Sequence, residues 1–568
     1  MEMSPGRTLG VLGESMDRRA FLKMSIVGAA AGGIAEILGA GKVLAAPSAH
    51  GRYESVVPEI FMPVPAPRQH SEAIVIGSGF GGSVSALRLA EAGIQTTLLE
   101  RGSRWPTDPW RDIYGSSDGR MFWHPSKSLA EKSLTSTLAI PAYAETLGSM
   151  ASVDDFGGLF EVSWHNNSVL MCGAAVGGGS VVYIGITAQS LRVPFDQVFR
   201  GVVDYDEMAR IWYPKALAGL GATTVPSDVY RHSSFDNARD FWRVAKNAKY
   251  SPYFVPGNWR WNVVRDEIAG RAKPMTITSA GARSNGSLNS LTFTYIPRAE
   301  STGKATVHPR HQVNDIHIER SGRFVLDVDY LSPYGDVLAK RILTTDRLVV
   351  AAGSLNTNRL LVKARDSGTL PNLNEYIGAA WGNNGNANFD VAVSGKKKDQ
   401  SAVGAVGFFD TEGHYARCVV NSTYSLGPME SVVAASNTSV IKAGLTSVDP
   451  TRGVFRYRRD SGTVVLDWPA GGNGGVAANS MRIAHRLADR SGLPVDAVVY
   501  EPDLMWAHGL GGADLGTACD AYGRVKGYKN LYVNDGAMIP GSAGASNPTL
   551  TITAVAERNI AHIISQGG

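Results

Sequence analysis

The chain has few cysteines and no cluster of metal-ligating side chains. Its 568 residues include only three cysteines, Cys172, Cys418 and Cys519, which lie far apart in the sequence. That count excludes the dense disulfide framework of small secreted domains, and the spacing excludes a thiolate metal site. No His-Glu-x-x-His motif occurs either, so we expect no metal. The sequence leaves open whether two of the cysteines pair.

Charge of one sign is also scarce. The chain has 55 Lys and Arg against 51 Asp and Glu, a net charge of +4, and its longest like-charge run is the three lysines at 396–398. Binding to nucleic acid is therefore not indicated. No repeat period is visible, which excludes solenoids and propellers. With 44% hydrophobic and 19% charged residues, the composition is that of a folded globular protein with a large core.

Long apolar runs are absent beyond the N-terminus. Arg18 and Arg19 precede an apolar stretch over residues 24–38, which is interrupted by glycines and an acid and is too short to span a bilayer. This pattern resembles a twin-arginine export signal over residues 1–46, followed by a proline-rich linker over 47–70. An ordinary amphipathic leader is the alternative. We therefore expect an exported protein, periplasmic or secreted, without a transmembrane span.

A glycine-rich turn lies between an apolar strand and a helix near residue 77. Residues 71–76 are mostly apolar, residues 77–82 are Gly-Ser-Gly-Phe-Gly-Gly, and residues 83–92 are rich in Ala and Leu. A second strand over 96–99 is followed by Glu100, which completes a βαβ unit of the dinucleotide-binding type. Backbone amides at the turn would meet a pyrophosphate, and Glu100 would accept hydrogen bonds from ribose hydroxyls. The predicted contacts are Gly77, Gly79, Phe80, Gly81, Gly82 and Glu100; spacing alone leaves FAD and NAD open.

Three further segments carry glycine turns or strand ends suited to a ligand. Residues 177–180, Gly-Gly-Gly-Ser, leave room for backbone to lie against a cofactor, with a plain close-packed turn as the alternative. A buried strand over 348–352 ends at Gly353, and a short strand over 531–533 ends in the turn Asn534-Asp535-Gly536. Because ligands bind at the carboxyl ends of parallel strands, both strand ends are candidate sites.

Together with two C-terminal motifs, these segments resemble the glucose-methanol-choline (GMC) oxidoreductase family. The C-terminal motifs are His508-Gly509-Leu510-Gly511-Gly512 and the stretch over 547–554, Asn-Pro-Thr-Leu-Thr-Ile-Thr-Ala. Supporting motifs cover residues 351–355, 364–374 and 523–533. The resemblance runs in the same order over most of 71–568. Within the family, the chain looks most like the bacterial cholesterol oxidases that bind FAD non-covalently.

The resemblance implies an α/β fold with two interleaved domains. A Rossmann-like FAD-binding domain with a parallel sheet would alternate with an α+β substrate domain containing a mainly antiparallel sheet. The implied FAD-binding segments are 71–189, 346–389 and 502–568. The implied substrate segments are 190–345, with insertions of the FAD domain, and 390–501. Alternating runs over 323–330 and 454–468 predict antiparallel strands.

For the site, the resemblance implies a flavin-dependent oxidation of an alcohol. His508 would accept or relay the proton of the substrate hydroxyl, Asn547 would hold the same oxygen, and the hydride would pass to flavin N5. The helix over 550–561 would direct its positive end at the flavin. The implied cofactor contacts are Gly177, Gly178, Gly179, Ser180, Asp535, Gly536, Pro548 and Thr549. The expected partners are a hydroxylated apolar substrate, with peripheral membrane contact for its uptake as one option, and O2 or another electron acceptor.

Some residues depart from the family pattern and keep other functions open. No acid lies between Glu412 and Glu430, where related cholesterol oxidases carry the glutamate that moves a proton during double-bond isomerisation. Tyr183 stands in place of an asparagine, and Gly509 in place of a proline. The alternatives are a GMC-fold oxidase or dehydrogenase for a non-sterol alcohol, a lyase or isomerase on the same fold, and an NAD(P)-linked dehydrogenase built on the glycine turn.

Overall fold

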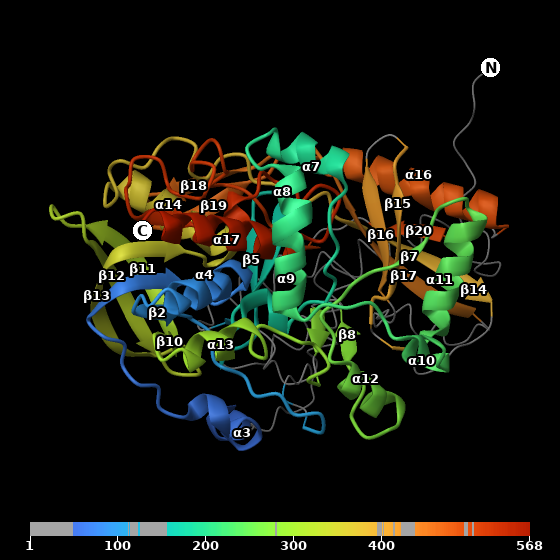
Figure 1. The fold of residues 1–568 in the computed structure, drawn as a ribbon, viewed down its shortest axis with the longest axis horizontal. Coiled ribbons are helices and arrows are strands. Elements are labelled where there is room, and N and C mark those ends of the chain that lie inside the picture. The colour runs from blue at the N-terminus through green and yellow to red at the C-terminus, as the bar shows by residue number, and fades with distance from the viewer. Residues whose placement is uncertain are drawn as a thin grey trace, which may run out of the picture.

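The computed structural model describes most of the chain after residue 48. The described residues are 49–111, 113, 123–124, 156–278, 281–283, 285–394, 400–401, 403–412, 415–421, 438–492, 498–501 and 505–567. The export signal predicted over 1–46 lies outside them. The described chain is built around two large sheets, which lie at opposite ends of the molecule in Figure 1.

The first sheet contains the βαβ unit that the glycine turn predicts. Its parallel part has the order β10-β2-β1-β13-β22, and β12 and β11 add an antiparallel extension. β13 serves both parts, because residues 344–350 pair with β1 while residues 337–345 pair with β12. The parallel strands end at one edge, where such sheets bind ligands. The strands are β1 (His70–Ile76), β2 (Thr96–Leu99), β10 (Ala305–His308), β11 (His311–Ile318), β12 (Phe324–Leu331), β13 (Val337–Val350) and β22 (Leu531–Val533).

Helices pack against this sheet through apolar faces. Helix α4 (Phe80–Glu91) begins at the glycine turn, and its residues 81–87 are all buried because it lies between the strands and two further helices, α13 (Tyr295–Ser301) and α17 (Pro548–Ser565). Helix α14 (Gly353–Ser367) follows β13 and contacts the hairpin formed by β18 (Val454–Arg458) and β19 (Thr463–Asp467). The ends of β1 and β13 therefore both lead into helices at the ligand edge.

The second sheet is antiparallel, with the order β20-β14-β17-β16-β15-β7. In β14 the apolar residues Phe389, Val391 and Val393 occupy every second position, so one face packs in a core with helices α11 and α16. The other face carries Asn388 and Asp390. The elements are β7 (Tyr253–Phe254), β14 (Ala387–Ser394), β15 (Val406–Asp410), β16 (Ala416–Asn421), β17 (Thr438–Ser447), β20 (Val498–Glu501), α11 (Asp236–Asn247) and α16 (Gly474–Ser491).

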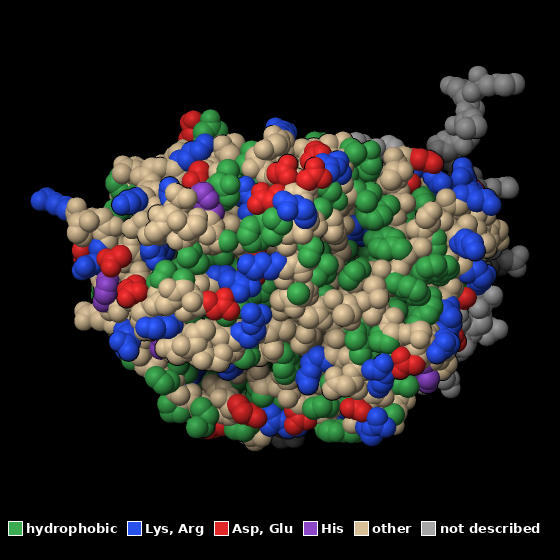
Figure 2. Space-filling model, in the orientation of Figure 1, with side chains coloured by type: hydrophobic (Ala, Val, Ile, Leu, Met, Phe, Trp, Pro, Cys, Tyr) green, Lys and Arg blue, Asp and Glu red, His purple; other side chains and the backbone are tan. Residues whose placement is uncertain are grey.

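Smaller elements join the two sheets. A three-stranded sheet has the order β21-β6-β5, and a series of short helices crosses the surface between the sheets. On the face shown in Figure 2, Lys and Arg side chains intermingle with Asp and Glu. No helix of the described chain is long and apolar enough to cross a membrane. The elements are β5 (Phe160–His165), β6 (Ser168–Gly173), β21 (Met505–Trp506), α7 (Arg192–Phe199), α9 (Tyr213–Leu220), α10 (Ser227–Tyr230) and α12 (Trp261–Ile268).

The predicted fold class, a parallel Rossmann-like sheet with a separate antiparallel sheet, is confirmed. The strands predicted over 71–76, 96–99 and 531–533 form within one residue of those bounds. The antiparallel strands predicted over 323–330 and 454–468 form as well. The first lies in the dinucleotide-type sheet, and the second packs on α14. The predicted domain boundaries stay a prediction.

Candidate active site

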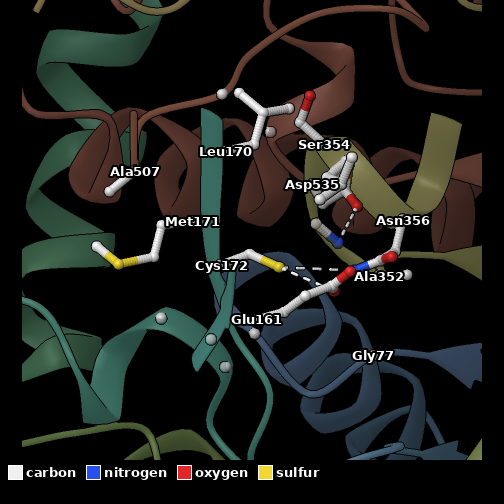
Figure 3. Close-up of a pocket in the computed structure, with 18 of the residues that line it drawn as sticks. Gly77, Glu161, Leu170, Met171, Cys172, Ala352, Ser354, Asn356, Ala507 and Asp535 are labelled. Carbon is white, nitrogen blue, oxygen red and sulfur yellow. Dashed lines mark hydrogen bonds between the residues drawn. The ribbon is translucent and has the colours of Figure 1, made fainter. Parts of the chain in front are cut away.

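A large cavity, with a volume of about 870 Å³, lies where the two sheets meet. Its wall combines the carboxyl edge of the first sheet with strands β14, β16 and β17 of the second, and Figure 3 shows the part that β5 and β6 contribute. Ligand pockets in proteins measure about 300–1,000 Å³. The cavity is therefore large enough for an extended cofactor at one end and a substrate at the other.

The two glycine turns meet at this cavity. Gly81 approaches the first sheet so closely that a Cβ atom would lie 1.5 Å from the carbonyl oxygen of Asn534. A Cβ on Gly178 would lie 2.7 Å from the Cα of Gly79. By contrast, a Cβ on Gly79 or Gly179 would meet no atom of the described chain within 4 Å. The turns thus pack tightly against the protein at Gly81 and Gly178 and leave their backbone open at Gly79 and Gly179. Such open backbone suits a pyrophosphate.

Glu100 follows the end of β2 in the same wall. One carboxylate oxygen accepts hydrogen bonds from the Ser78 N–H (3.1 Å) and hydroxyl (2.7 Å), and the other accepts from the Gly102 N–H (2.9 Å). Burial raises the pKa of Glu100, although these hydrogen bonds oppose the rise. A carboxylate has about four acceptor positions, so about one is left for a ribose hydroxyl.

Three residues that were predicted to contact the cofactor, Gly82, Gly177 and Ser180, do not line the cavity but stabilise the turns that form its wall. Gly82 lies against the Gly77 carbonyl, where a Cβ would be 1.9 Å from the oxygen. The Gly177 N–H donates to Ser78 Oγ (3.0 Å), and the Ser180 hydroxyl donates to the Gly177 carbonyl (2.7 Å). The remaining predicted residues all line the cavity: Gly77, Gly79, Phe80, Gly81, Glu100, Gly178, Gly179, His508, Asp535, Gly536, Asn547, Pro548 and Thr549.

Asp535 ties the strand ends of the first sheet together. Its Oδ2 accepts from the Gly353 N–H (2.8 Å) and the Thr357 hydroxyl (2.5 Å), and its Oδ1 accepts from the Ala537 N–H (2.8 Å). Burial raises the pKa of Asp535 to about 6. Since protein donors fill most of this carboxylate, its main contribution is to fix the turns that present Gly536 and Gly353 to the cavity.

Asn547 lies directly before helix α17 in the wall of the cavity. It occupies the N-cap position, with Pro548 next, but its side chain makes no capping hydrogen bond to the helix. The amide therefore remains available to the cavity that it lines. Helix α17 has 18 residues, and its N-terminus directs partial positive charge toward the same space.

His508 is held by a residue that the sequence analysis missed. Its Nδ1 lies 2.9 Å from the side-chain oxygen of Asn386, 122 residues earlier in the chain. Because that oxygen only accepts, Nδ1 carries the proton and Nε2 is left as an acceptor. Burial lowers the pKa of His508 to about 4, so the neutral ring is the form present at neutral pH. The only sequence signal for Asn386 is a run rich in asparagine and glycine at 383–388, directly before and into an alternating strand.

A buried arginine fixes the loop that carries Asn547. Arg417, on β16, donates to the Ser546 hydroxyl (2.7 Å) and to the Gln189 carbonyl. The Asn384 side-chain NH2 donates to the Ser546 carbonyl (2.8 Å). Burial lowers the pKa of Arg417, and among the described residues no carboxylate pairs with it. The second sheet therefore positions both His508, through Asn386, and the start of α17, through Arg417.

Strands β5 and β6 carry a polar cluster around Cys172 in the cavity wall (Figure 3). The thiol lies 3.5 Å from Glu161 and 3.7 Å from the Asn356 side-chain nitrogen. Glu161 also pairs with Arg101 and Arg359. Burial, followed by the charge of Glu161, raises the pKa of Cys172 to about 12, so the thiol stays protonated. All three cysteines are free thiols.

Comparisons with known proteins agree with this geometry. Residues 479–556, which include His508 and Asn547, match the family model described as GMC oxidoreductase. The chain is 24% identical to a cholesterol oxidase of Acinetobacter baumannii, over 86% of this chain and 94% of that protein. It is 26% identical to a cholesterol oxidase of Mycobacterium tuberculosis, over 86% and 90% of the two chains.

A solved structure shares the fold. The crystal structure of pyridoxine 4-oxidase from Mesorbium loti superposes with a TM-score of 0.57 at 14% sequence identity, covering 87% of this chain and 99% of that one. At this identity the likeness concerns the fold.

Proposed function

We propose that this chain acts on alcohols as a GMC oxidoreductase and, like the members of that family, uses FAD. The substrate that we propose is bulky and sterol-like, and its secondary hydroxyl is oxidised with transfer of hydride to N5 of non-covalently bound FAD. The observation that carries the proposal is the His508–Asn386 contact. It leaves a neutral imidazole with Nε2 as an acceptor, in a cavity that Asn547 also lines and that reaches the dinucleotide-type turn.

His508 and Asn547 have different roles at the substrate oxygen. Nε2 of His508 accepts the hydroxyl proton, since the bond to Asn386 keeps the other ring nitrogen protonated. The Asn547 amide donates to the same oxygen and orients the carbon that loses hydride. The positive end of α17 stabilises negative charge that develops nearby.

The described residues fit FAD. The open backbone at Gly79 and Gly179 would hold its pyrophosphate, Glu100 would hold the adenosine ribose, and Gly536 would lie along the chain that leads to the flavin ring. None of these contacts needs a covalent bond between a side chain and the cofactor, which agrees with non-covalent binding.

A sterol-like substrate is supported by the cholesterol oxidase relatives and by an apolar part of the cavity wall. Ile184, Ile186 and Val419 contribute that part. Val419 comes from the segment that lacks an acid, so the proposed reaction ends at the ketone. Electrons would pass to O2, giving H2O2, and the paired arginines at 18–19 support export of the enzyme.

The test is an aerobic assay of the purified protein with a 3β-hydroxysterol, in which ketone and H2O2 are measured together. Equal amounts of both are expected, and their loss is expected in His508→Ala. Ketone without H2O2 would indicate a dehydrogenase that uses another acceptor. Neither product from any sterol, with a bound flavin present, would refute the substrate class.

A second candidate substrate is a smaller and more polar alcohol. Asn388, Asp390 and Thr446 line the cavity from the second sheet, which is unusual for a site that holds hydrocarbon alone. The structural relative is named as an oxidase of pyridoxine, a compact alcohol. Pyridoxine in the same assay separates the two candidates, since only the polar-substrate reading predicts its turnover.

A further inference from the structure

The cavity face of the second sheet is arranged in rows of side chains. The first row runs from Asn386, just before β14, through Thr446 on β17 to Arg417 on β16, because Ala387 pairs with Leu445 and Arg417 pairs with Thr446. In this row Asn386 holds His508, and Arg417 holds the loop before Asn547. Thr446 thus lies between the two supports of the reacting centre.

Thr446 carries a hydroxyl that the fold does not use. Its residue is 4% exposed, it lines the cavity, and its Oγ1 has no hydrogen-bond partner in the described chain. A buried hydroxyl without a partner costs free energy, and such groups in native proteins need an explanation. A ligand group in the cavity supplies one.

The second row supplies another unused polar group. It consists of Asn388, Gly444 and Val419, which are direct neighbours across the three strands. Asn388 lines the cavity, and its side-chain amide makes no hydrogen bond to any described residue. Gly444, opposite it, has no side chain to fill the space. Diagonal neighbours on an antiparallel sheet are about 7–8 Å apart, so Asn388 and Thr446 can bind one group above Gly444.

The spacing relates this polar position to the reacting hydroxyl. Asn386 and Asn388 are two residues apart along one chain, about 6.6 Å in extended conformation, and Asn386 contacts His508 directly. A second polar group on the substrate, separated from the oxidised hydroxyl by about the width of one six-membered ring, would therefore reach Asn388 and Thr446.

We propose that Asn388 and Thr446 form a second oxygen-binding subsite, so that the preferred substrates are alcohols that carry a further hydroxyl or carbonyl on or next to the oxidised ring. This rests on the proposed function and narrows its substrate class. The subsite uses a hydroxyl and an amide, both of which donate and accept, so it takes a neutral oxygen group. A site built to bond an oxygen rejects the analogue that lacks it, because its own polar groups are then left unpaired.

The test compares matched probes by the rate of anaerobic flavin bleaching. The probes are cyclohexanol against cyclohexane-1,4-diol, and a 3β-hydroxysterol against the same sterol with a second ring hydroxyl. The measured quantity is the ratio of second-order rate constants, dihydroxy over monohydroxy. We expect a ratio of at least about 10 for the unaltered enzyme in one of the pairs, since one or two hydrogen bonds are gained.

Variants locate the effect. Thr446→Val, which is nearly the same size, and Asn388→Leu are expected to bring the ratio close to 1, while Thr446→Ser keeps it because the hydroxyl remains. Thermal unfolding checks that each variant is folded. A ratio near 1 for both probe pairs in the unaltered enzyme would overturn the subsite, and so would a high ratio that survives both Thr446→Val and Asn388→Leu. Flavin that stays oxidised with all four probes would instead overturn the proposed alcohol oxidation, and the subsite with it.

Discussion

At the scale of single residues, the proposed chemistry depends on the protonation state of His508. Burial lowers the pKa of this imidazole to about 4, below its usual value near 6.5. A group with a lowered pKa is neutral, and able to accept a proton, at every pH above that value. The enzyme is therefore expected to lose activity only as the pH falls toward 4, where the His508 ring becomes protonated.

The corresponding prediction concerns the pH profile of kcat/KM. Its acid limb is expected to have a midpoint near 4, because kcat/KM reports the free enzyme's essential base. Stopped-flow measurement over short times avoids acid unfolding during the assay. An acid midpoint near 6.5 would show that His508 titrates as an exposed histidine.

Asn386 is expected to position His508. Asn386→Leu removes the acceptor for Nδ1 and frees the ring to rotate or to change tautomer. Misplacement of a catalytic group by about 1 Å costs on the order of 100-fold in rate, so we expect kcat to fall by about that factor with flavin still bound. Asn386→Asp, which retains an acceptor, should recover part of the rate and shift the acid limb upward. Equal kcat in Asn386→Leu and the unaltered enzyme would remove Asn386 from the mechanism.

At the scale of elements, the glycine turn before α4 contains glycines with two different roles, which look alike in the sequence. Gly81 has no space for a side chain, since a Cβ would lie 1.5 Å from the Asn534 carbonyl oxygen. Gly79 has φ −69°, which any residue adopts, and a Cβ there meets nothing in the described chain. Gly81 is therefore needed for packing, and Gly79 for access of a ligand.

This pair gives a matched prediction. Gly81→Ala is expected to lower stability by about 3 kcal/mol or more through overpacking against backbone. Gly79→Ala is expected to fold normally but to be purified with little flavin, because its methyl group takes the space beside the pyrophosphate. Flavin absorbance per protein and thermal unfolding distinguish the two. Full flavin content in Gly79→Ala would contradict the assigned cofactor position.

Helices α4, α9, α13 and α17 are joined by one buried acid, Glu557. Its carboxylate accepts two hydrogen bonds from Arg88 (2.8 and 2.7 Å) and one from the Tyr295 hydroxyl (3.0 Å), and it pairs with Lys215 (3.1 Å). Breaking such a buried pair costs about 3–5 kcal/mol, so Glu557→Gln should lower the free energy of unfolding by that order. Asp228→Asn is the control, since its pair with Arg265 is exposed and screened by solvent and should contribute little to the free energy of unfolding. Similar losses in denaturant unfolding of both variants would refute the special role of Glu557.

The sequence predicts a helix or strand well where a local residue pattern is enough to specify it. Residues 71–100 carry strand, turn, helix and strand in a single local signal, and all four form. The extra antiparallel strands β11 and β12 could not be assigned to a sheet in this way. Their alternation predicts a strand, but only the pairing of β12 with the long β13 places them in the dinucleotide-type sheet.

At the scale of the whole molecule, the site exists only because two sheets meet. His508 and Asn547 lie in motifs that the sequence reveals, but their supports, Asn386 and Arg417, come from the second sheet. Nothing local marks an asparagine as the partner of a histidine more than a hundred residues away. The sequence does not mark Thr446 either, because only the structure shows that its hydroxyl is buried without a hydrogen-bond partner among the described residues.

The most direct test of the central claim is an absorption spectrum of the purified protein under anaerobic conditions, before and after addition of a 3β-hydroxysterol. The account predicts an oxidised-flavin band that bleaches on addition of the alcohol, and bleaches far more slowly in His508→Ala. A protein without a flavin band after gentle purification, or with a band that no alcohol bleaches, would contradict the assignment as a flavin-dependent alcohol oxidase.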